Sequence, residues 1–259
     1  MDLGLTGKSV VVTGAGRGIG LAITRAFVGE GARVVAGSRR TSVDLKELAN
    51  QGLVTPVEVD LADPGGPGRL IEAAGDRIDV LVNNVGIAPP RPGGFLAVTD
   101  EQWTATWNLN VMAAVRATRA ALPVMLAGGG GAIVNIGSVN ARLPDPLVID
   151  YSASKAALVN LAKALSKEFG GRGIRVNTVD PGPVSTDLWL GAGGVAATVG
   201  ATQGIAPDDV VAGAAATTVT GRFSRPDEIA DLVLLLSSGL TANVVGADVT
   251  IDGGLITTL

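Results

Sequence analysis

"VVVTGAGRGIG", residues 10–20, is the stretch that decides the fold. A β-branched run that predicts a strand leads through a glycine-rich turn into a predicted helix. The free backbone N–H groups and the dipole of such a helix favour a bound pyrophosphate. The glycines are spaced G-x3-G-x-G, which differs from the G-x-G-x-x-G fingerprint. We expect Gly14 to form the tight turn, Gly18 to admit a phosphate, and Gly20 to pack helix on strand. A purely structural connection is the alternative.

The same strand-to-helix unit recurs along the chain. Strands are expected at 9–13, 33–36, 54–60, 80–83, 132–136, 175–179 and 248–251. Helices are expected at 19–30, 45–51, 68–74, 101–126, 151–169 and 226–237. Right-handed crossovers then build an α/β fold, a Rossmann-type doubly wound parallel sheet of about seven strands with helices on both faces. Its ligand is expected at the carboxyl ends of the strands.

The chain is expected to form one domain over residues 1–259. Its 259 residues and hydrophobic content of 47% are enough for one large α/β core. No charge block or linker marks a boundary. The Gly-, Ala- and Thr-rich segment 187–221 predicts a mobile loop or helical excursion at the substrate site.

The composition excludes several function classes. The net charge of −4 offers no basic surplus for DNA or RNA. The absence of cysteine and histidine removes disulfides, thiol nucleophiles, cysteine-ligated metals and histidine triads, and no metal site is expected. We find no signal peptide, and the uncharged tract 188–207 is too rich in Gly, Ala and Thr for a membrane span. The protein is therefore expected to act without a membrane, in the cytoplasm.

The end of the second predicted strand, "VVAGSRR", indicates which nucleotide binds. A carboxylate here would hydrogen-bond a ribose 2′-hydroxyl. Ser38 stands in that place, and Arg39, Arg40 and Arg17 are cations that suit a 2′-phosphate. NADP(H) is therefore expected in preference to NAD(H), which remains possible. The alternative is that these arginines are ordinary solvated charges.

"YSASK", residues 151–155, holds the only tyrosine of the chain. Tyr151 and Lys155 are four apart on a predicted helix, so they share one face. A phenol has a reference pKa of about 10, and lowering it to about 7 requires about 4 kcal/mol. One cation about 4 Å away at an effective dielectric of about 20 supplies that much. Lys155 is thus expected to lower the pKa of Tyr151 and make it a general acid/base, with the positive nicotinamide ring of the oxidised cofactor adding to the effect.

Six segments occur in order: "TGAGRGIG" (13–20), "NNVG" (83–86), "NLNV" (108–111), "IGS" (136–138), "YSASK" (151–155) and "DPGPVST" (180–186). With them, nearly the whole chain resembles a short-chain dehydrogenase/reductase of the classical type. The resemblance implies a catalytic tetrad of Asn110, Ser138, Tyr151 and Lys155, and a hydride transfer between NADP(H) and a carbonyl or secondary alcohol. Ser138 would hydrogen-bond the substrate oxygen, although a turn-capping role is the alternative.

The resemblance also implies further cofactor contacts. These come from Ile19, Asp60, Leu61, Asn84, Gly86, Tyr151, Lys155, Pro181, Gly182, Val184 and Thr186. Asp60 would meet the adenine amino group, with a strand-end cap as the alternative, while Val184 and Thr186 would hold the carboxamide.

The substrate is expected to be a small carbonyl or alcohol. Apolar residues such as Leu143, Leu147 and Trp189 favour a hydrophobic one, although they could equally pack on the loop or on another subunit. Family members commonly pair through the helices at 101–126 and 151–169, so a homotetramer is expected. Two other functions stay open: an NADP(H)-sensing regulator without turnover, and a dehydratase or epimerase on the same scaffold.

Overall fold

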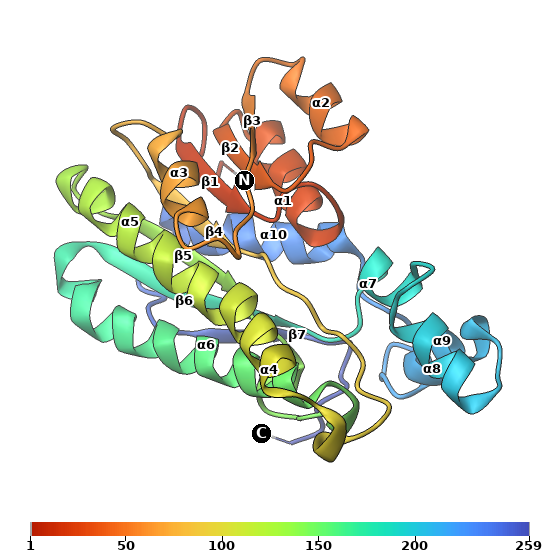
Figure 1. The fold of residues 1–259 in the computed structure, drawn as a ribbon. Helices are drawn as coiled ribbons and strands as arrows, with labels where there is room; N and C mark the ends of the chain where they lie inside the picture. The colour runs from red at the N-terminus through yellow and green to blue at the C-terminus, as the bar shows by residue number, and fades with distance from the viewer. Residues whose placement is uncertain (1, 259) are drawn as a thin grey trace.

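The computed structural model describes residues 2–258 and has a seven-stranded parallel sheet at its centre (Figure 1). The strands are β1 (Ser9–Thr13), β2 (Arg33–Ser38), β3 (Val54–Glu58), β4 (Val80–Asn83), β5 (Gly131–Ile136), β6 (Ile174–Pro181) and β7 (Asp248–Ile251). They are ordered β3-β2-β1-β4-β5-β6-β7. The predicted doubly wound fold is confirmed. The predicted ends of β3 at residue 60 and of β6 at residue 179 are wrong, because the pairing of β3 with β2 ends at Glu58, while Asp180 and Pro181 still pair with β7.

Helices cover both faces of the sheet. Residues of α1 (Gly18–Gly29), α2 (Val43–Ala49) and α10 (Pro226–Ser237) join one buried cluster. Those of α3 (Gly66–Glu72), α5 (Ala113–Ala127) and α6 (Ile149–Phe169) join the other. Short 3₁₀ turns lie at Phe95–Ala97, Val139–Ala141, Pro146–Val148, Gly170–Arg172 and Gly239–Thr241.

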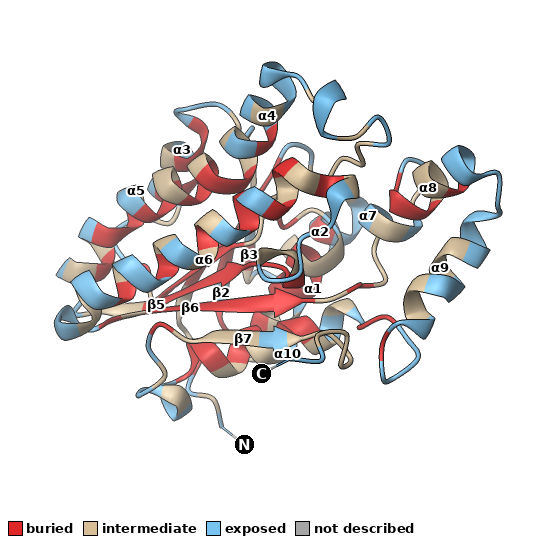
Figure 2. Ribbon diagram, turned by 90° about the horizontal axis from the view of Figure 1, so that it is seen from below, coloured by how far each residue is buried: buried red, intermediate tan, exposed pale blue. Residues whose placement is uncertain are grey.

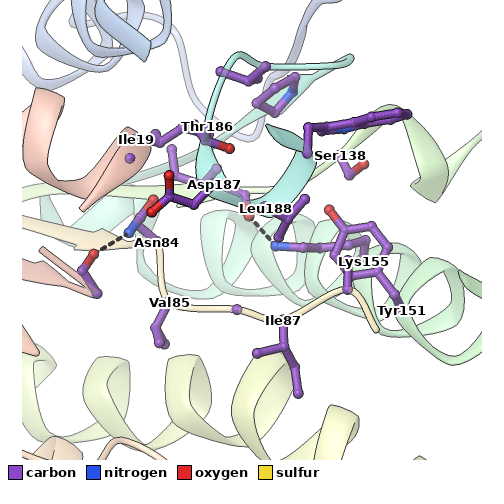
Figure 3. A pocket seen from close by; sticks show the side chains of 18 of the residues that line it. Ile19, Asn84, Val85, Ile87, Ser138, Tyr151, Lys155, Thr186, Asp187 and Leu188 are labelled. Carbon is purple, nitrogen blue, oxygen red and sulfur yellow. Dashed lines mark hydrogen bonds between the residues drawn. The ribbon is translucent and has the colours of Figure 1, made fainter. Parts of the chain in front are cut away.

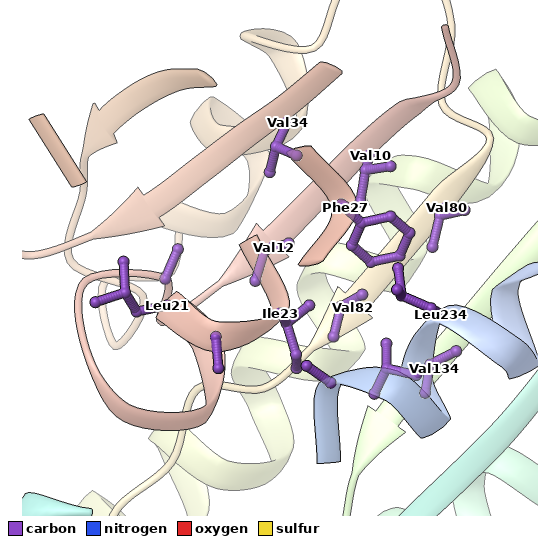
Figure 4. Packing of buried hydrophobic residues seen from close by; sticks show 14 of the residues in the cluster. Val10, Val12, Leu21, Ile23, Phe27, Val34, Val80, Val82, Val134 and Leu234 are labelled. Atoms are coloured by element: carbon purple, nitrogen blue, oxygen red, sulfur yellow. The ribbon is translucent and has the colours of Figure 1, made fainter. Parts of the chain in front are cut away.

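Strand alternation divides the core between these two layers. Val10 and Val12 point toward Phe27 of α1, whereas Val11 belongs to the cluster on the opposite face (Figure 4). Figure 2 shows the result, with central strands such as β6 buried, the edge strand β7 only partly buried, and helices that are buried only on their inner sides. A β-branched run buried on both faces is the pattern of a central parallel strand.

The expected helix at 101–126 is interrupted. It consists of α4 (Asp100–Trp107), a π-helical turn at Asn108–Met112, and α5. By length and composition this helix, Asp100–Ala127, passes as a candidate membrane span. Ala113, Ala117, Ala121 and Met125 are nevertheless buried against the sheet, which accounts for its apolar character. A π turn within an α-helix is rare and frequently marks a functional site.

The segment at 187–221 contains helices that no local pattern predicted individually. These are α7 (Asp187–Leu190), α8 (Val195–Gln203) and α9 (Pro207–Ala216), which project beyond the sheet in Figure 1. Much of α9 is exposed, so its sequence carries little amphipathic signal. The mobility of the segment stays a prediction.

Candidate active site

A large cleft of about 1290 Å³ lies at the carboxyl ends of the strands. It spans the point where the strand order reverses, between β1 and β4, which is where an open α/β sheet binds its ligand. All the residues expected to contact the cofactor line this cleft: Gly14, Arg17, Gly18, Ile19, Gly20, Ser38, Arg39, Asp60, Leu61, Asn84, Gly86, Tyr151, Lys155, Pro181, Gly182, Val184 and Thr186.

The glycine turn is held in place by Asn84, the residue directly after β4. Asn84 donates through Nδ2 to the carbonyls of Thr13, at 2.8 Å, and Gly14, at 3.1 Å. Gly14 has φ +70°, the left-handed conformation that the turn requires. A Cβ at Gly20 would lie 2.2 Å from the carbonyl oxygen of Gly14, so only glycine lets α1 start this close to β1.

The end of β2 forms the distal wall of the cleft. Ser38 is buried, and its hydroxyl donates to the carbonyl of Arg40 at 2.9 Å, while the side chains of Arg39 and Arg40 are exposed. Arg17 of the glycine turn also lines the cleft, with Nη1 3.6 Å from Oδ2 of Asp187 in α7. This ion pair is exposed and therefore weak.

The other cofactor candidates lie on neighbouring strand ends. Asp60 is exposed and accepts the N–H of Ala62 at 2.9 Å, which is the strand-end cap weighed as its alternative role. Leu61 beside it is buried. Beyond β6, Gly182 donates its N–H to Ile251 at 3.0 Å, which fixes the start of the segment that carries Val184 and Thr186.

Ser138, Tyr151 and Lys155 meet at the opposite end of the cleft (Figure 3). Ser138 follows β5, and the other two lie one turn apart on α6. Lys155 Nζ lies 5.5 Å from the centre of the Tyr151 ring and donates to the carbonyl of Ile136 at 2.7 Å. Within residues 2–258, no cluster of three or more acidic, histidine or cysteine side chains is placed to hold a metal ion.

The surroundings of Tyr151 act against the expected lowering of its pKa. Burial raises the pKa of Tyr151 to about 12, and the charge of Asp180 raises it too, while a hydrogen bond with Ser138 opposes them. Burial also lowers the pKa of Lys155 to about 8, against the charge of Asp180. The sequence gives the spacing of the two groups, but not the loss of water around them, and desolvation decides the direction here.

Asn110 lies behind the cleft and does not line it. It is buried in the π turn, where its Oδ1 accepts the N–H of Ile87 at 2.8 Å. Its Nδ2 donates to the Ile87 carbonyl and to Ser154 Oγ, both at 2.9 Å. Asn110 thus ties the loop after β4 to the helix that carries Tyr151 and Lys155.

Two groups around Ser138 and Tyr151 were missed from the sequence. Asp180 accepts the backbone N–H of Ser138 at 2.9 Å. It lies inside "DPGPVST", but nothing local indicates that it points at residue 138. The second group is a buried cluster in which Arg91 and Thr106 donate hydrogen bonds to the carboxylate of Asp150, the residue before Tyr151.

Outside the expected cofactor residues, the cleft has a mainly apolar lining. Its lining residues include Asn140, Leu143, Asp145, Leu147, Val148, Leu188, Trp189, Val195 and Leu255. Trp189 is held by an edge-to-face contact with Phe223, at 5.0 Å between ring centres. Helices α7 and α8 thus contribute side chains to the cleft.

Comparison with known proteins shows which family the chain belongs to. A family model described as short chain dehydrogenase matches residues 8–192. The chain belongs to this family of oxidoreductases. D-threitol dehydrogenase of Mycolicibacterium smegmatis is 36% identical, over 98% of this chain and 94% of that protein. A 3-oxoacyl-[acyl-carrier-protein] reductase of Thermotoga maritima is 34% identical, over 97% and 99% of the two chains.

A solved structure shares the fold over the full length of this short-chain dehydrogenase. The L-sorbose reductase of Gluconobacter frateurii, in complex with NADPH and L-sorbose, has a TM-score of 0.91, with 35% identity and 100% coverage of both chains. The relatives named here thus act on substrates of different polarity, and the family alone does not select one.

Proposed function

We propose that this short-chain dehydrogenase transfers a hydride between NADP(H) and a carbonyl or secondary alcohol, with Tyr151 as the general acid/base. One observation carries the proposal: Ser138, Tyr151 and Lys155 converge at one end of a cleft whose other end is a helix-opening glycine turn. The dinucleotide supplies the hydride at C4 of its nicotinamide ring.

Each side chain of the proposed tetrad has a separate role in this reaction. The Ser138 hydroxyl hydrogen-bonds the substrate oxygen, and the Tyr151 hydroxyl exchanges a proton with it. The Lys155 ammonium stabilises negative charge on the phenol. Asn110 is a positioning residue, since its hydrogen bonds to Ile87 and Ser154 hold two walls of the site together.

Carbonyl reduction requires the neutral phenol form of Tyr151, which donates its proton to the substrate oxygen. With a pKa raised to about 12, the phenol keeps its proton and is ready to donate it. Alcohol oxidation needs the phenolate, which the positive ring of the oxidised nicotinamide would help to stabilise. We therefore expect oxidation to gain, and reduction to lose, rate as the pH rises.

NADP(H) is the proposed cofactor. The end of β2 presents Ser38, Arg39 and Arg40 to the cleft, with no carboxylate at position 38 to repel a 2′-phosphate. The NADPH complex of the sorbose reductase supports this choice.

The proposed substrate carries an apolar substituent next to its carbonyl. Leu143, Leu147, Trp189 and Leu255 supply an apolar wall, while Asn140 and Asp145 are the polar side chains near it. Activity confined to small, highly polar carbonyls would refute the apolar pocket while leaving the redox chemistry in place.

The test is oxidation of NADPH by the purified protein with a panel of aliphatic ketones, acyl thioesters, steroids and sugars. Tyr151→Phe should lose about 10²- to 10⁴-fold in kcat, the usual contribution of a general acid, and should still bind NADPH. Unchanged turnover in this variant would remove Tyr151 from its role. Binding without turnover would indicate a regulator, and a changed substrate without net NADPH consumption would indicate a dehydratase or epimerase.

We also propose a cytoplasmic homotetramer assembled through α5 and α6. Small residues of α6, among them Ala153, Ala156 and Ala164, are exposed and would allow a second helix to approach closely. Light scattering should give four times the chain mass, and a monomer at every concentration would overturn the assembly.

A further inference from the structure

Asp180 is a completely buried carboxyl directly beneath the catalytic serine. It is 0% exposed at the end of β6, and its Oδ1 accepts the Ser138 N–H at 2.9 Å. A Cβ at Gly137 would lie 1.8 Å from this oxygen. The carboxyl therefore fits against the end of β5 only because residue 137 is glycine.

A second carboxyl, Asp248, lies beside it on β7. The register pairs Thr178 with Asp248 and Asp180 with Thr250, so the two aspartates lie on one face of the sheet. Asp180 Oδ2 and Asp248 Oδ1 are both buried, and neither has a partner in the hydrogen-bond network of residues 2–258. Two neighbouring carboxylates whose facing oxygens are buried repel, whereas one proton between them provides a donor for the acceptor opposite.

Arg142 determines where that proton resides. Its Nη2 forms an ion pair with Asp248 Oδ2, and its Nη1 donates to Thr250 Oγ1 at 3.1 Å. The guanidinium of Arg142 thus contacts Asp248 and not Asp180, so the proton of the pair belongs on Asp180. In agreement, burial and then the charge of Asp248 raise the pKa of Asp180 to about 7, against the Ser138 N–H and Arg142.

The charge of Asp180 acts on the catalytic residues. As a carboxylate it raises the pKa of both Tyr151 and Lys155, so it favours the neutral phenol and the ammonium. The ionisable groups around Asp180 are therefore Asp248 on β7, Arg142 after β5, and Tyr151 and Lys155 on α6.

We propose that Asp180 and Asp248 share one proton, that Asp180 positions Ser138, and that the charge of Asp180 controls the protonation of Tyr151. In this role Asp180 is a positioning residue for the reaction. The catalytic meaning rests on the proposed function, whereas the shared proton and its effect on the phenol do not.

The chain allows a direct test, because Tyr151 is its only tyrosine. The ultraviolet absorbance of the phenolate, read after a rapid pH jump and before unfolding, gives the titration midpoint of this one residue without any substrate. The variants are Asp180→Asn, which keeps the shape and an acceptor for Ser138, and Asp248→Asn. Asp76→Asn is the control for the loss of one charge, since Asp76 is exposed and precedes β4, at the amino end of the sheet.

Asp180→Asn should lower the midpoint of Tyr151 by about one pH unit, because it removes a neighbouring negative charge. Asp248→Asn and Asp76→Asn should leave the midpoint near the wild-type value. If the Tyr151 midpoint is the same in Asp180→Asn as in Asp76→Asn, the charge of Asp180 does not govern the protonation of Tyr151. The same conclusion follows if Asp248→Asn lowers the midpoint as much as Asp180→Asn does.

Infrared spectroscopy tests the shared proton in the unmodified protein. The carbonyl band of a protonated carboxyl should persist at mildly acidic pH, disappear in both Asp180→Asn and Asp248→Asn, and remain in Asp76→Asn. Absence of the band in the wild type would overturn the shared proton, even if one of the variants does not fold. Lack of turnover with every carbonyl would refute the proposed function alone, since neither measurement needs turnover.

Discussion

The buried ion pair between Arg91 and Asp150 should contribute far more to stability than an exposed pair of nearly the same length. Arg91 Nη2 lies 2.6 Å from Asp150 Oδ2, and the two side chains are only 11% and 0% exposed. Arg25 Nη2 lies 2.8 Å from Asp44 Oδ1, with 51% and 55% exposed. Replacing either arginine by methionine keeps a long side chain and removes the charge.

The expected magnitudes differ because of burial. Arg91→Met leaves a buried carboxylate with Thr106 as its remaining side-chain partner and should lower the free energy of unfolding by about 3 to 5 kcal/mol. Arg25→Met should lower it by less than about 1 kcal/mol. The total free energy of unfolding of a domain is about 5 to 15 kcal/mol. The loss in Arg91→Met is therefore a large fraction of the total stability, and the loss in Arg25→Met is a small one.

The pH dependence provides a second check. Burial acts to raise the pKa of Asp150, but the hydrogen bonds from Arg91 and Thr106 outweigh it and hold the pKa below its ordinary value. A lowered pKa stabilises the fold above the unfolded value of about 3.9, and that stability is lost as the pH falls through the folded value. The difference in unfolding free energy between the wild type and Arg91→Met should therefore be largest at neutral pH and should decrease below about pH 4.

Urea denaturation followed by circular dichroism measures both variants. Asp150→Asn, added to Arg91→Met, should restore part of the loss because it removes the stranded charge. Equal losses in Arg91→Met and Arg25→Met, or a loss that does not change with pH, would show that burial of this pair does not have the effect described.

Two further predictions concern the cofactor. Gly20→Ala places a Cβ 2.2 Å from the Gly14 carbonyl, so it should destabilise the protein by about 1 to 3 kcal/mol and weaken NADPH binding in a fluorescence titration; wild-type stability and binding would contradict this account of the turn. Ser38→Asp puts a carboxylate at the end of β2, and should lower the ratio of kcat/KM for NADPH over NADH by at least about tenfold, or about 1.4 kcal/mol; an unchanged ratio would mean that position 38 does not meet the 2′-phosphate.

Local spacing was sufficient for much of the site. The run from Val10 to Gly20 predicts a strand, a turn and a helix because each depends on residues close in the chain. Tyr151 and Lys155 share a face of α6 for the same reason. The absence of an acid at position 38 is likewise visible without coordinates.

The tertiary structure alone decided the electrostatics around these groups. Asp180 meets Ser138 across 42 positions of the chain, and Arg91 meets Asp150 across 59. Such contacts depend on strand register and on loops that return to the sheet, which no local pattern contains. Burial is also a property of the assembled fold, and it is burial that raises the pKa of Tyr151 where spacing alone predicted a decrease. The sequence by itself determined which groups are present and which of them share a helix face, whereas packing determined how much water they keep and therefore where their protons lie.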